Sequence, residues 1–264
     1  MKIYDAHAHI YPAKIADKAV AAIGSFYGIP MAGGTGTADD LIASGSQIGV
    51  SKYLVHSTAT NPQQVRAIND YIIGECKAHP DVFVGFGTLH PDMEDIESEV
   101  EYIISSGLKG VKLHPDFQKF SVDDSAIDCL YEATAGRLPI LFHAGDKRYQ
   151  YSNPSRIAKV ARRWKELTIV AAHFGGYSEW EEASKELLEL NNVIFDTSSS
   201  LSFLEPAKAV DMIHKAGVHK FMFGTDYPMW NHKSEFERFM NLALSDSERE
   251  QILSKNMAAL CDIE

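Results

Sequence analysis

About eight short apolar runs recur along the chain, and most carry apolar residues at nearly every position. Such runs are typical of parallel strands buried on both faces. Amphipathic segments separate them, as in residues 94–107, where apolar side chains recur at helical spacing before a glycine. The runs are residues 1–10, 52–57, 82–91, 110–115, 139–145, 168–175, 193–198 and 220–228.

This alternation of strand and helix predicts the fold class. From the second run onward the repeat is about 25 to 30 residues, the size of one βα unit. Eight such units in 264 residues predict an α/β protein with a (β/α)8 TIM barrel, as a single domain over residues 1–264. A doubly wound open sheet is the alternative, but no G-x-G-x-x-G follows the first strand.

The first predicted strand carries two histidines. Side chains alternate along a strand, so Asp5, His7 and His9 are expected on one face. Residues two apart on a strand lie roughly 6.6 Å apart, so both imidazoles could bind one metal ion. The alternative is the half-exposed polar face of an edge strand.

Metal-capable residues also stand at or near the ends of later strands, where the active site of a barrel is built. These are His56, His90, His114, His143, His173 and Asp226. One or two of these histidines could be hydrogen-bonded side chains of the core. That explanation is harder to sustain for a whole ring of histidines next to an aspartate. Four other histidines fall in predicted helices or loops, where solvated or locally hydrogen-bonded side chains are expected: His79, His214, His219 and His232.

Four motifs in order carry a family resemblance: the His-x-His of the first strand, FHAG (142–145), AHFGG (172–176) and GTDYP (224–228). Together they resemble the amidohydrolase superfamily. The closest similarity is to its mononuclear-metal branch, which includes aminocarboxymuconate-semialdehyde decarboxylase and related metal-dependent hydrolases. The match covers nearly the whole chain.

The resemblance implies one divalent metal ion bound by His7, His9, His143 and Asp226, with His173 as a catalytic residue. Neutral imidazoles and one carboxylate suit Zn²⁺ and leave a position open for water. A bound ion can lower the pKa of that water to about 7. Asp226 is expected to pass the proton of the water to the leaving group, and His173 to orient the nucleophile or stabilise an oxyanion.

The fourth strand, GVKLHP (110–115), bears on the number of metal ions. Binuclear members of the superfamily use a carboxylated lysine to bridge two metals, and Lys112 is a candidate for that role. The preferred interpretation is a mononuclear site, in which His114 binds substrate and Lys112 lies deeper in an ion pair. Asp5 is a candidate partner for Lys112, or an acceptor that orients a ligand histidine.

Two further segments hold candidates for substrate binding. Arg148 follows His143 in a predicted loop and could bind a substrate carboxylate bidentately, although a surface arginine is an equally good explanation. Trp230 and His232 follow Asp226 and could wall a pocket, with packing at the rim as the alternative for the aromatic ring.

Composition limits the partners. The chain has 25 Lys and Arg against 36 Asp and Glu, a net charge of −11, which argues against nucleic acid or an anionic membrane surface as the main partner. No apolar run approaches the roughly 20 residues that span a bilayer, and the N-terminal segment does not resemble a signal peptide. We expect a cytoplasmic enzyme with a small-molecule substrate, and a homo-oligomer remains open.

Three functions fit these features. The first is a zinc-dependent hydrolase of a small organic amide, lactone or ester. The second is a metal-dependent nonoxidative decarboxylase of an unsaturated or aromatic carboxylic acid. Both use the same metal ligands, so the ligands do not discriminate between them. The third is a binding or scaffold barrel with a vestigial metal site, which the full ligand set disfavours.

Overall fold

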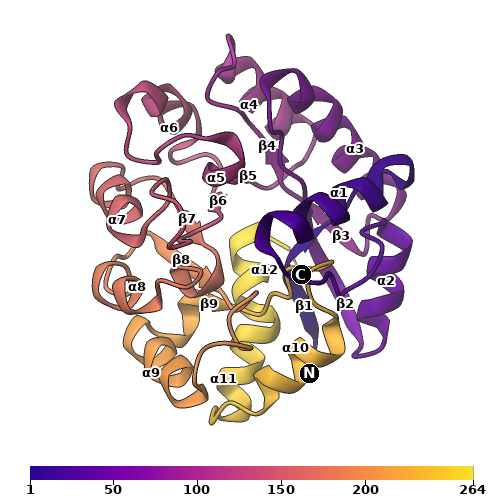
Figure 1. Ribbon diagram of the computed structural model, residues 1–264, viewed down its shortest axis with the longest axis vertical. Coiled ribbons are helices and arrows are strands. Elements are labelled where there is room, and N and C mark those ends of the chain that lie inside the picture. Colours follow the sequence, from indigo (N-terminus) through magenta and orange to yellow (C-terminus); the bar gives the residue numbers. More distant parts are fainter. Residues whose placement is uncertain (264) are drawn as a thin grey trace. The chain divides into compact units, whose positions relative to one another are not determined.

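The structure, a computed structural model, describes residues 1–263, and Figure 1 labels their helices and strands. The chain forms two compact units. The first unit contains Met1–His56, Glu75–Val84 and the chain from Thr197 onward. The second contains Ser57–Gly74 and Gly85–Asp196.

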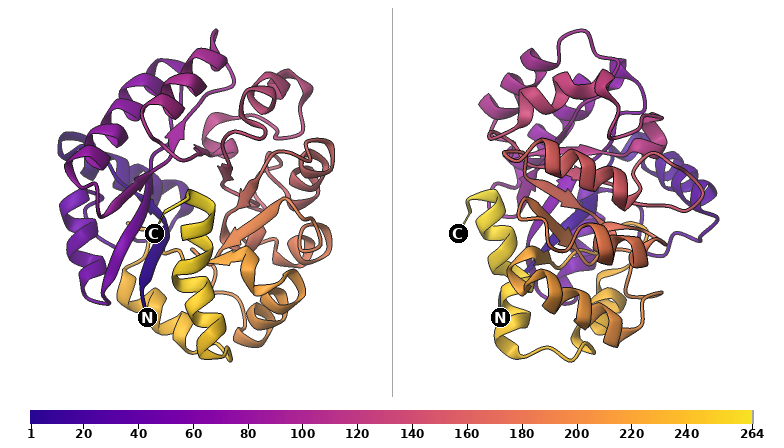
Figure 2. Two further views of the ribbon diagram at one scale, coloured as in Figure 1. Left: turned by 180° about the vertical axis from the view of Figure 1, so that it is seen from behind. Right: turned by 90° about the vertical axis from the view of Figure 1, so that its left-hand side faces the viewer.

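In the first unit, strand β1 (Ile3–His9) lies between two parallel neighbours. It pairs with β2 (Val50–His56), and the register places His9 opposite His56. Figure 2 shows these two strands side by side. On its other side, Ala8 forms a parallel bridge with Tyr227, which follows β9 (Phe221–Met222). The carboxyl end of β1 therefore lies beside both the end of β2 and the segment after β9.

In the second unit, five short parallel strands follow one another in chain order. Their residues are buried except for one position, as expected for strands covered on both faces. The strands are β4 (Gly87–Thr88), β5 (Val111–Leu113), β6 (Ile140–Phe142), β7 (Ile169–Ala171) and β8 (Val193–Asp196).

Helices connect the strands, and side-chain caps define several of their starts. Asp95 accepts the Ser98 N–H at the start of α4, and Asn231 accepts the Ser234 N–H at the start of α10. The helices are α1 (Ala13–Tyr27), α2 (Ala38–Ser46), α3 (Val65–Ala78), α4 (Ile96–Ser105), α5 (Pro115–Gln118), α6 (Asp128–Thr134), α7 (Pro154–Arg163), α8 (Trp180–Glu186), α9 (Pro206–Ala216), α10 (His232–Met240), α11 (Asp246–Glu250) and α12 (Asn256–Cys261).

Two details differ from the sequence-based expectations. The predicted strand at 82–91 is two short strands, β3 (Phe83–Gly85) and β4. The half-exposed edge strand considered for residues 3–9 is wrong, because six of the seven residues of β1 are buried and His9 is partly buried. The physical reason is that β1 has a neighbour on each side.

Candidate active site

Three potential metal ligands come together in the first unit. The Nε2 atoms of His7 and His9 lie 3.4 and 3.2 Å from Oδ1 of Asp226. The His7 side chain is buried, whereas those of His9 and Asp226 are 13% and 11% exposed. Two imidazole nitrogens therefore approach one carboxylate oxygen, and two of the three side chains are partly exposed to solvent. This donor set fits a divalent zinc or manganese ion.

The backbone places Asp226 by an uncommon conformation. Its φ is 59°, in the left-handed region that residues other than glycine rarely adopt. The Asp226 N–H donates to the carbonyl of His7 at 2.8 Å, which ties this residue to β1. Such backbone strain persists where the surrounding structure enforces it and is often found at active sites.

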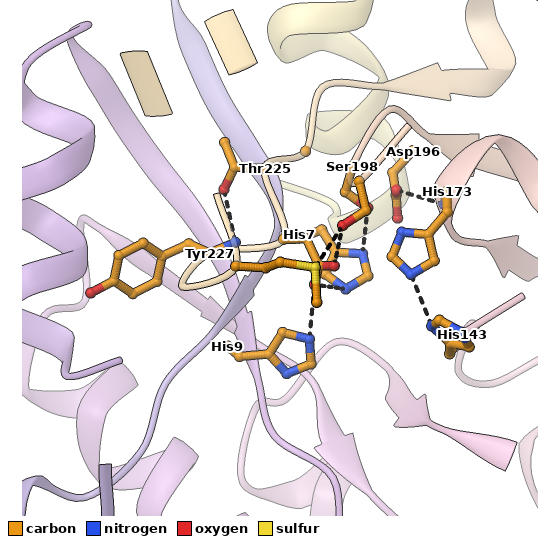
Figure 3. Close-up of polar contacts among 12 residues, drawn as sticks. His7, His9, His143, His173, Asp196, Ser198, Thr225 and Tyr227 are labelled. Carbon is orange, nitrogen blue, oxygen red and sulfur yellow. Dashed lines mark hydrogen bonds and ion pairs between the residues drawn. The ribbon is translucent and has the colours of Figure 1, made fainter. Parts of the chain in front are cut away.

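His7 has a partner on each ring nitrogen. Its Nδ1 lies 3.2 Å from Oγ of Ser198 (Figure 3). Its Nε2 faces Asp226. When Nδ1–H donates to the serine hydroxyl, Nε2 carries the lone pair that a metal ion needs. Ser198 is thus a functional candidate that the sequence motifs did not reveal.

A third histidine joins this group. The ring of His56 lies edge-on to those of His7 and His9, with centroids 4.8 and 4.4 Å away. Each of the three offers a ring nitrogen, and these atoms lie within 4.8 Å of one another. The strand-end position of His56 is evident in the sequence, but no motif assigns it a role.

The buried carboxylate of Asp5 accepts hydrogen bonds from the backbone of this group. Oδ1 of Asp5 accepts the N–H groups of His7 and Thr225, both at 3.0 Å, and Oδ2 accepts the Thr225 hydroxyl at 2.6 Å. Oδ2 also lies 3.0 Å from Nε2 of His232, whose Nδ1 lies 2.8 Å from the Ser44 hydroxyl. Asp5 therefore orients a candidate ligand through its backbone. His232 is fully buried, so the expectation of a solvated side chain is wrong, and its hydrogen-bond partner Ser44 is distant in the chain.

In the second unit, three predicted site histidines pack together. His143 Nδ1 lies 3.0 Å from His173 Nε2, as Figure 3 shows, and His143 Nε2 lies 3.5 Å from Oδ2 of Asp116. The ring of His114 stacks on that of His143, with centroids 4.1 Å apart and planes 5° apart. An ion bound at Nδ1 of His143 would replace the contact with His173, and one bound at Nε2 would replace the contact with Asp116.

His173 is fixed by its backbone. Its φ is 61°, and its N–H donates to Oδ1 of Asp196 at 3.0 Å (Figure 3). Its carbonyl accepts the Trp180 indole N–H at 3.0 Å. Asp196 is the last residue of β8, a strand-end carboxylate that no sequence motif indicated. These contacts leave the imidazole to face His143.

Asp116 is an unexpected buried acid. Neither carboxylate oxygen has a hydrogen-bond partner among the described residues, and the residue is 5% exposed. Burial, reinforced by the charges of Asp146 and Glu179 and opposed by Arg148, raises the pKa of Asp116 to about 8. Asp116 is therefore mainly protonated at neutral pH.

The candidate substrate residues have defined partners. Arg148 donates to Asp146 through Nε (3.0 Å to Oδ1) and a terminal nitrogen (2.6 Å to Oδ2), so a substrate carboxylate would compete with that aspartate. His114 lies between the rings of His143 and Phe117. Lys112 is fully buried in β5, and its carbonyl accepts the Thr88 hydroxyl at 3.0 Å.

Trp230 lies near the Asp226 carboxylate. Its indole N–H donates to Oγ of Ser199 at 2.9 Å, and that hydroxyl donates to Oδ2 of Asp226 at 2.5 Å. The ring of Phe203, 51% exposed, lies edge-on to Trp230 at 6.0 Å. The aromatic side chains of Trp230 and Phe203 therefore lie near the carboxylate of Asp226.

No helix within the described residues is long and apolar enough to cross a membrane.

Solved structures with the same fold cover nearly the whole chain. An uncharacterised TIM-barrel protein from Bordetella bronchiseptica matches with 20% identity and a TM-score of 0.82, over 98% of each chain. A dihydroxybenzoic acid decarboxylase from Polaromonas sp. JS666, with manganese and 2-nitroresorcinol bound, matches with 14% identity and a TM-score of 0.76, over 99% of this chain and 97% of the other. A candidate 2-pyrone-4,6-dicarboxylic acid hydrolase from Pseudomonas putida matches with 18% identity and a TM-score of 0.70, over 100% and 98%.

These likenesses confirm the (β/α)8-barrel fold predicted from the strand and helix rhythm. A search of curated proteins gave no significant match. The model of the amidohydrolase family matches residues 4–262. Since that match spans nearly the whole chain, the protein belongs to the amidohydrolase family of enzymes.

Proposed function

We propose that the protein is a metal-dependent decarboxylase of an aromatic carboxylic acid, with hydrolysis of a lactone or related ester or amide as the second candidate. The observation that carries the proposal is the approach of His7 Nε2 and His9 Nε2 to Oδ1 of Asp226, at 3.4 and 3.2 Å. Similarity to a manganese-containing decarboxylase of an aromatic acid favours the first reaction.

The proposed cofactor is one divalent ion, held by His7, His9 and Asp226 with His143 as the fourth ligand that the family resemblance implies. Nitrogen and oxygen donors of this kind suit Zn²⁺, and Mn²⁺ is the alternative suggested by the related decarboxylase. When bound, such an ion polarises a carbonyl or carboxylate oxygen and acidifies a water molecule.

In the proposed decarboxylation the protein transfers one proton to the substrate. The bond between the ring carbon and the carboxylate breaks, carbon dioxide leaves, and the electron pair left on the ring carbon takes up a proton. Asp226, partly exposed and held in place by its backbone, is proposed to take this proton from a water molecule and deliver it to the ring carbon. His173 is proposed to stabilise the negative charge or to exchange the proton with Asp226.

The substrate contacts are proposed from side-chain chemistry. The exposed Phe203 ring and the adjacent Trp230 offer apolar faces to an aromatic ring. His114 and Arg148 remain candidates for binding a carboxylate, and Arg148 would have to exchange Asp146 for the substrate. A small organic acid is therefore the proposed substrate class.

Hydrolysis is the second candidate because the carboxylate of Asp226 could serve in both reactions. Asp226 would then accept a proton from the attacking water and return it to the leaving group. The similarity to a candidate lactone-dicarboxylate hydrolase favours this alternative. An ion held by these residues would polarise the carbonyl of a lactone substrate.

One experiment separates the two reactions. Protein reconstituted with Zn²⁺ or Mn²⁺ is incubated with a panel of hydroxybenzoic and enoic acids and with a panel of lactones, esters and amides. Release of carbon dioxide from an aromatic acid supports the first proposal, and ring opening or ester cleavage without carbon dioxide supports the second. Turnover of neither panel by metal-loaded protein would favour the scaffold interpretation.

The site is proposed to be mononuclear, with Lys112 unmodified, in a cytoplasmic protein. A carboxyl adduct on Lys112, detected by mass spectrometry together with two bound ions per chain, would replace this proposal with a binuclear centre. The oligomeric state can be measured on the same preparation by light scattering.

A further inference from the structure

The two oxygens of the Asp226 carboxylate have different partners. Oδ1 faces the Nε2 atoms of His7 and His9, at 3.4 and 3.2 Å. Oδ2 accepts a hydrogen bond from Oγ of Ser199 at 2.5 Å, the short distance typical of a hydroxyl bound to an ionised carboxylate. The carboxylate is therefore oriented, with one oxygen directed at the candidate metal ligands.

Trp230 determines the direction of this hydrogen bond. Its Nε1–H lies 2.9 Å from Oγ of Ser199, and an indole nitrogen can only donate. The serine oxygen is thus the acceptor, and its own proton points elsewhere. The available acceptors are Oδ2 of Asp226 and, at 3.4 Å, Sδ of Met229. The carboxylate is the much stronger acceptor, so the chain of donation runs from Trp230 through Ser199 to Asp226.

The backbone holds Ser199 in a costly conformation. Its φ is 50°, in the left-handed region, and the residue is buried. Residues other than glycine, asparagine and aspartate rarely adopt this conformation, because their Cβ atom approaches the backbone too closely. Asp226 is left-handed as well, so both ends of the short hydrogen bond depend on enforced backbone geometry.

We propose that Ser199, itself directed by Trp230, is a positioning residue for metal binding by Asp226. The Ser199 hydroxyl holds Oδ2 so that Oδ1 alone is presented beside His7 and His9. Without that hydroxyl, the carboxylate can rotate about its terminal bond and exchange its two oxygens. This inference rests on the proposed function, because it assigns Asp226 to the metal.

The test measures metal binding, not turnover. Metal-free wild-type protein, Ser199→Ala and Ser199→Gly are titrated with Zn²⁺ against a chelator, and their unfolding temperatures are recorded without metal. We expect both variants to bind Zn²⁺ about 10- to 100-fold more weakly, the usual loss when a hydrogen bond to a metal ligand is removed. The glycine variant relieves the left-handed strain, so weaker binding by this variant cannot be attributed to a less stable fold.

A spectroscopic signature and a double mutant distinguish positioning from a general structural effect. In Co²⁺-loaded protein, both Ser199 variants should alter the visible absorption bands, which report ligand geometry. Trp230→Phe should weaken Zn²⁺ binding less than Ser199→Ala does. In the Ser199→Ala background it should add nothing further, because the two groups act through one chain of donation. Additive losses would overturn the role given to Trp230.

Ser200→Ala is the matched control. Ser200 is buried beside Ser199, but its hydroxyl donates to the carbonyl of Ser198 at 3.0 Å instead. Its Zn²⁺ affinity and Co²⁺ spectrum should remain those of the wild type. Wild-type affinity and spectrum in both Ser199 variants would overturn this inference alone, provided that His7→Ala loses the ion. If the wild type binds no ion, the proposed function and the inference both fail.

Discussion

Oδ2 of Asp5 lies 3.0 Å from Nε2 of His232, and both side chains are fully buried. The same carboxylate accepts the backbone N–H groups of His7 and Thr225. It therefore joins β1 to the segment that carries Asp226, and both of these carry candidate metal ligands.

Asp5→Asn tests the importance of this carboxylate. The substitution keeps the size of the side chain, removes the negative charge beside His232, and replaces an oxygen that accepts buried hydrogen bonds with an amide NH2 group that only donates. Leaving buried donors without an acceptor typically costs about 1–3 kcal/mol, and we expect a loss in this range in the free energy of unfolding. Urea unfolding of metal-free protein measures it.

The control for this prediction is a solvent-exposed ion pair. Lys215 and Asp211 lie one helical turn apart in α9 at 2.7 Å, with both side chains more than half exposed. Asp211→Asn should change the free energy of unfolding by no more than about 0.5 kcal/mol. Equally small changes in the free energy of unfolding for Asp5→Asn and Asp211→Asn would show that Asp5 does not stabilise the contact between β1 and the segment that carries Asp226.

Metal content tests the proposed ligands. His7→Ala, His9→Ala and His143→Ala should each bind well below one equivalent of Zn²⁺ after dialysis, because each removes one donor from a small set. His214→Ala is the control, since that imidazole is half exposed and pairs with Glu248. One full equivalent of tightly bound metal in all three variants would contradict the ligand assignment.

The strand-end positions were the part of the site that the sequence could predict. His56 is the last residue of β2, and His114 and His143 come directly after β5 and β6. Apolar runs define where a buried strand ends, and parallel strands direct their carboxyl ends to one face. The residues that follow such runs can therefore be identified from the order of residues alone.

Contacts between distant segments could not be predicted in this way. The Asp5–His232 pair and the hydrogen bond from Ser199 to Asp226 join residues far apart in the chain. The second contact also depends on left-handed backbone at two residues that are not glycine. Periodicity reports which face of an element is buried, but it carries no information on such partners.

The pH dependence of stability tests the buried carboxyl of Asp116. Burial raises its pKa from 3.8 to about 8, so between these values the folded protein holds a proton that the unfolded chain has released. Stability should therefore fall as the pH rises from about 4 to about 8. The Asp116→Asn variant cannot ionise at this position. The unfolding temperature of this variant should therefore rise relative to that of the wild type as the pH increases across this range.

The unfolding temperatures of the metal-free wild type and Asp116→Asn are compared at pH 5, 6.5 and 8. Asp17→Asn on the exposed side of α1 is the control for the loss of a surface carboxyl group. A constant difference for Asp116→Asn would show that Asp116 is ionised throughout, and that its environment compensates the charge.

The last prediction separates the roles of His173 and Asp226. His173 is assigned to the chemistry and is held through its backbone by Asp196 and Trp180. His173→Ala should therefore keep the metal and the fold but slow turnover by roughly 10²–10⁴-fold, the usual loss for a positioned acid–base group. Asp226→Ala should lower both metal content and turnover, because one carboxylate binds the ion and moves the proton. Metal content and turnover are measured on the same preparations, with the substrate identified from the two panels. If His173→Ala loses the metal while Asp226→Ala keeps both metal and activity, the two roles are reversed.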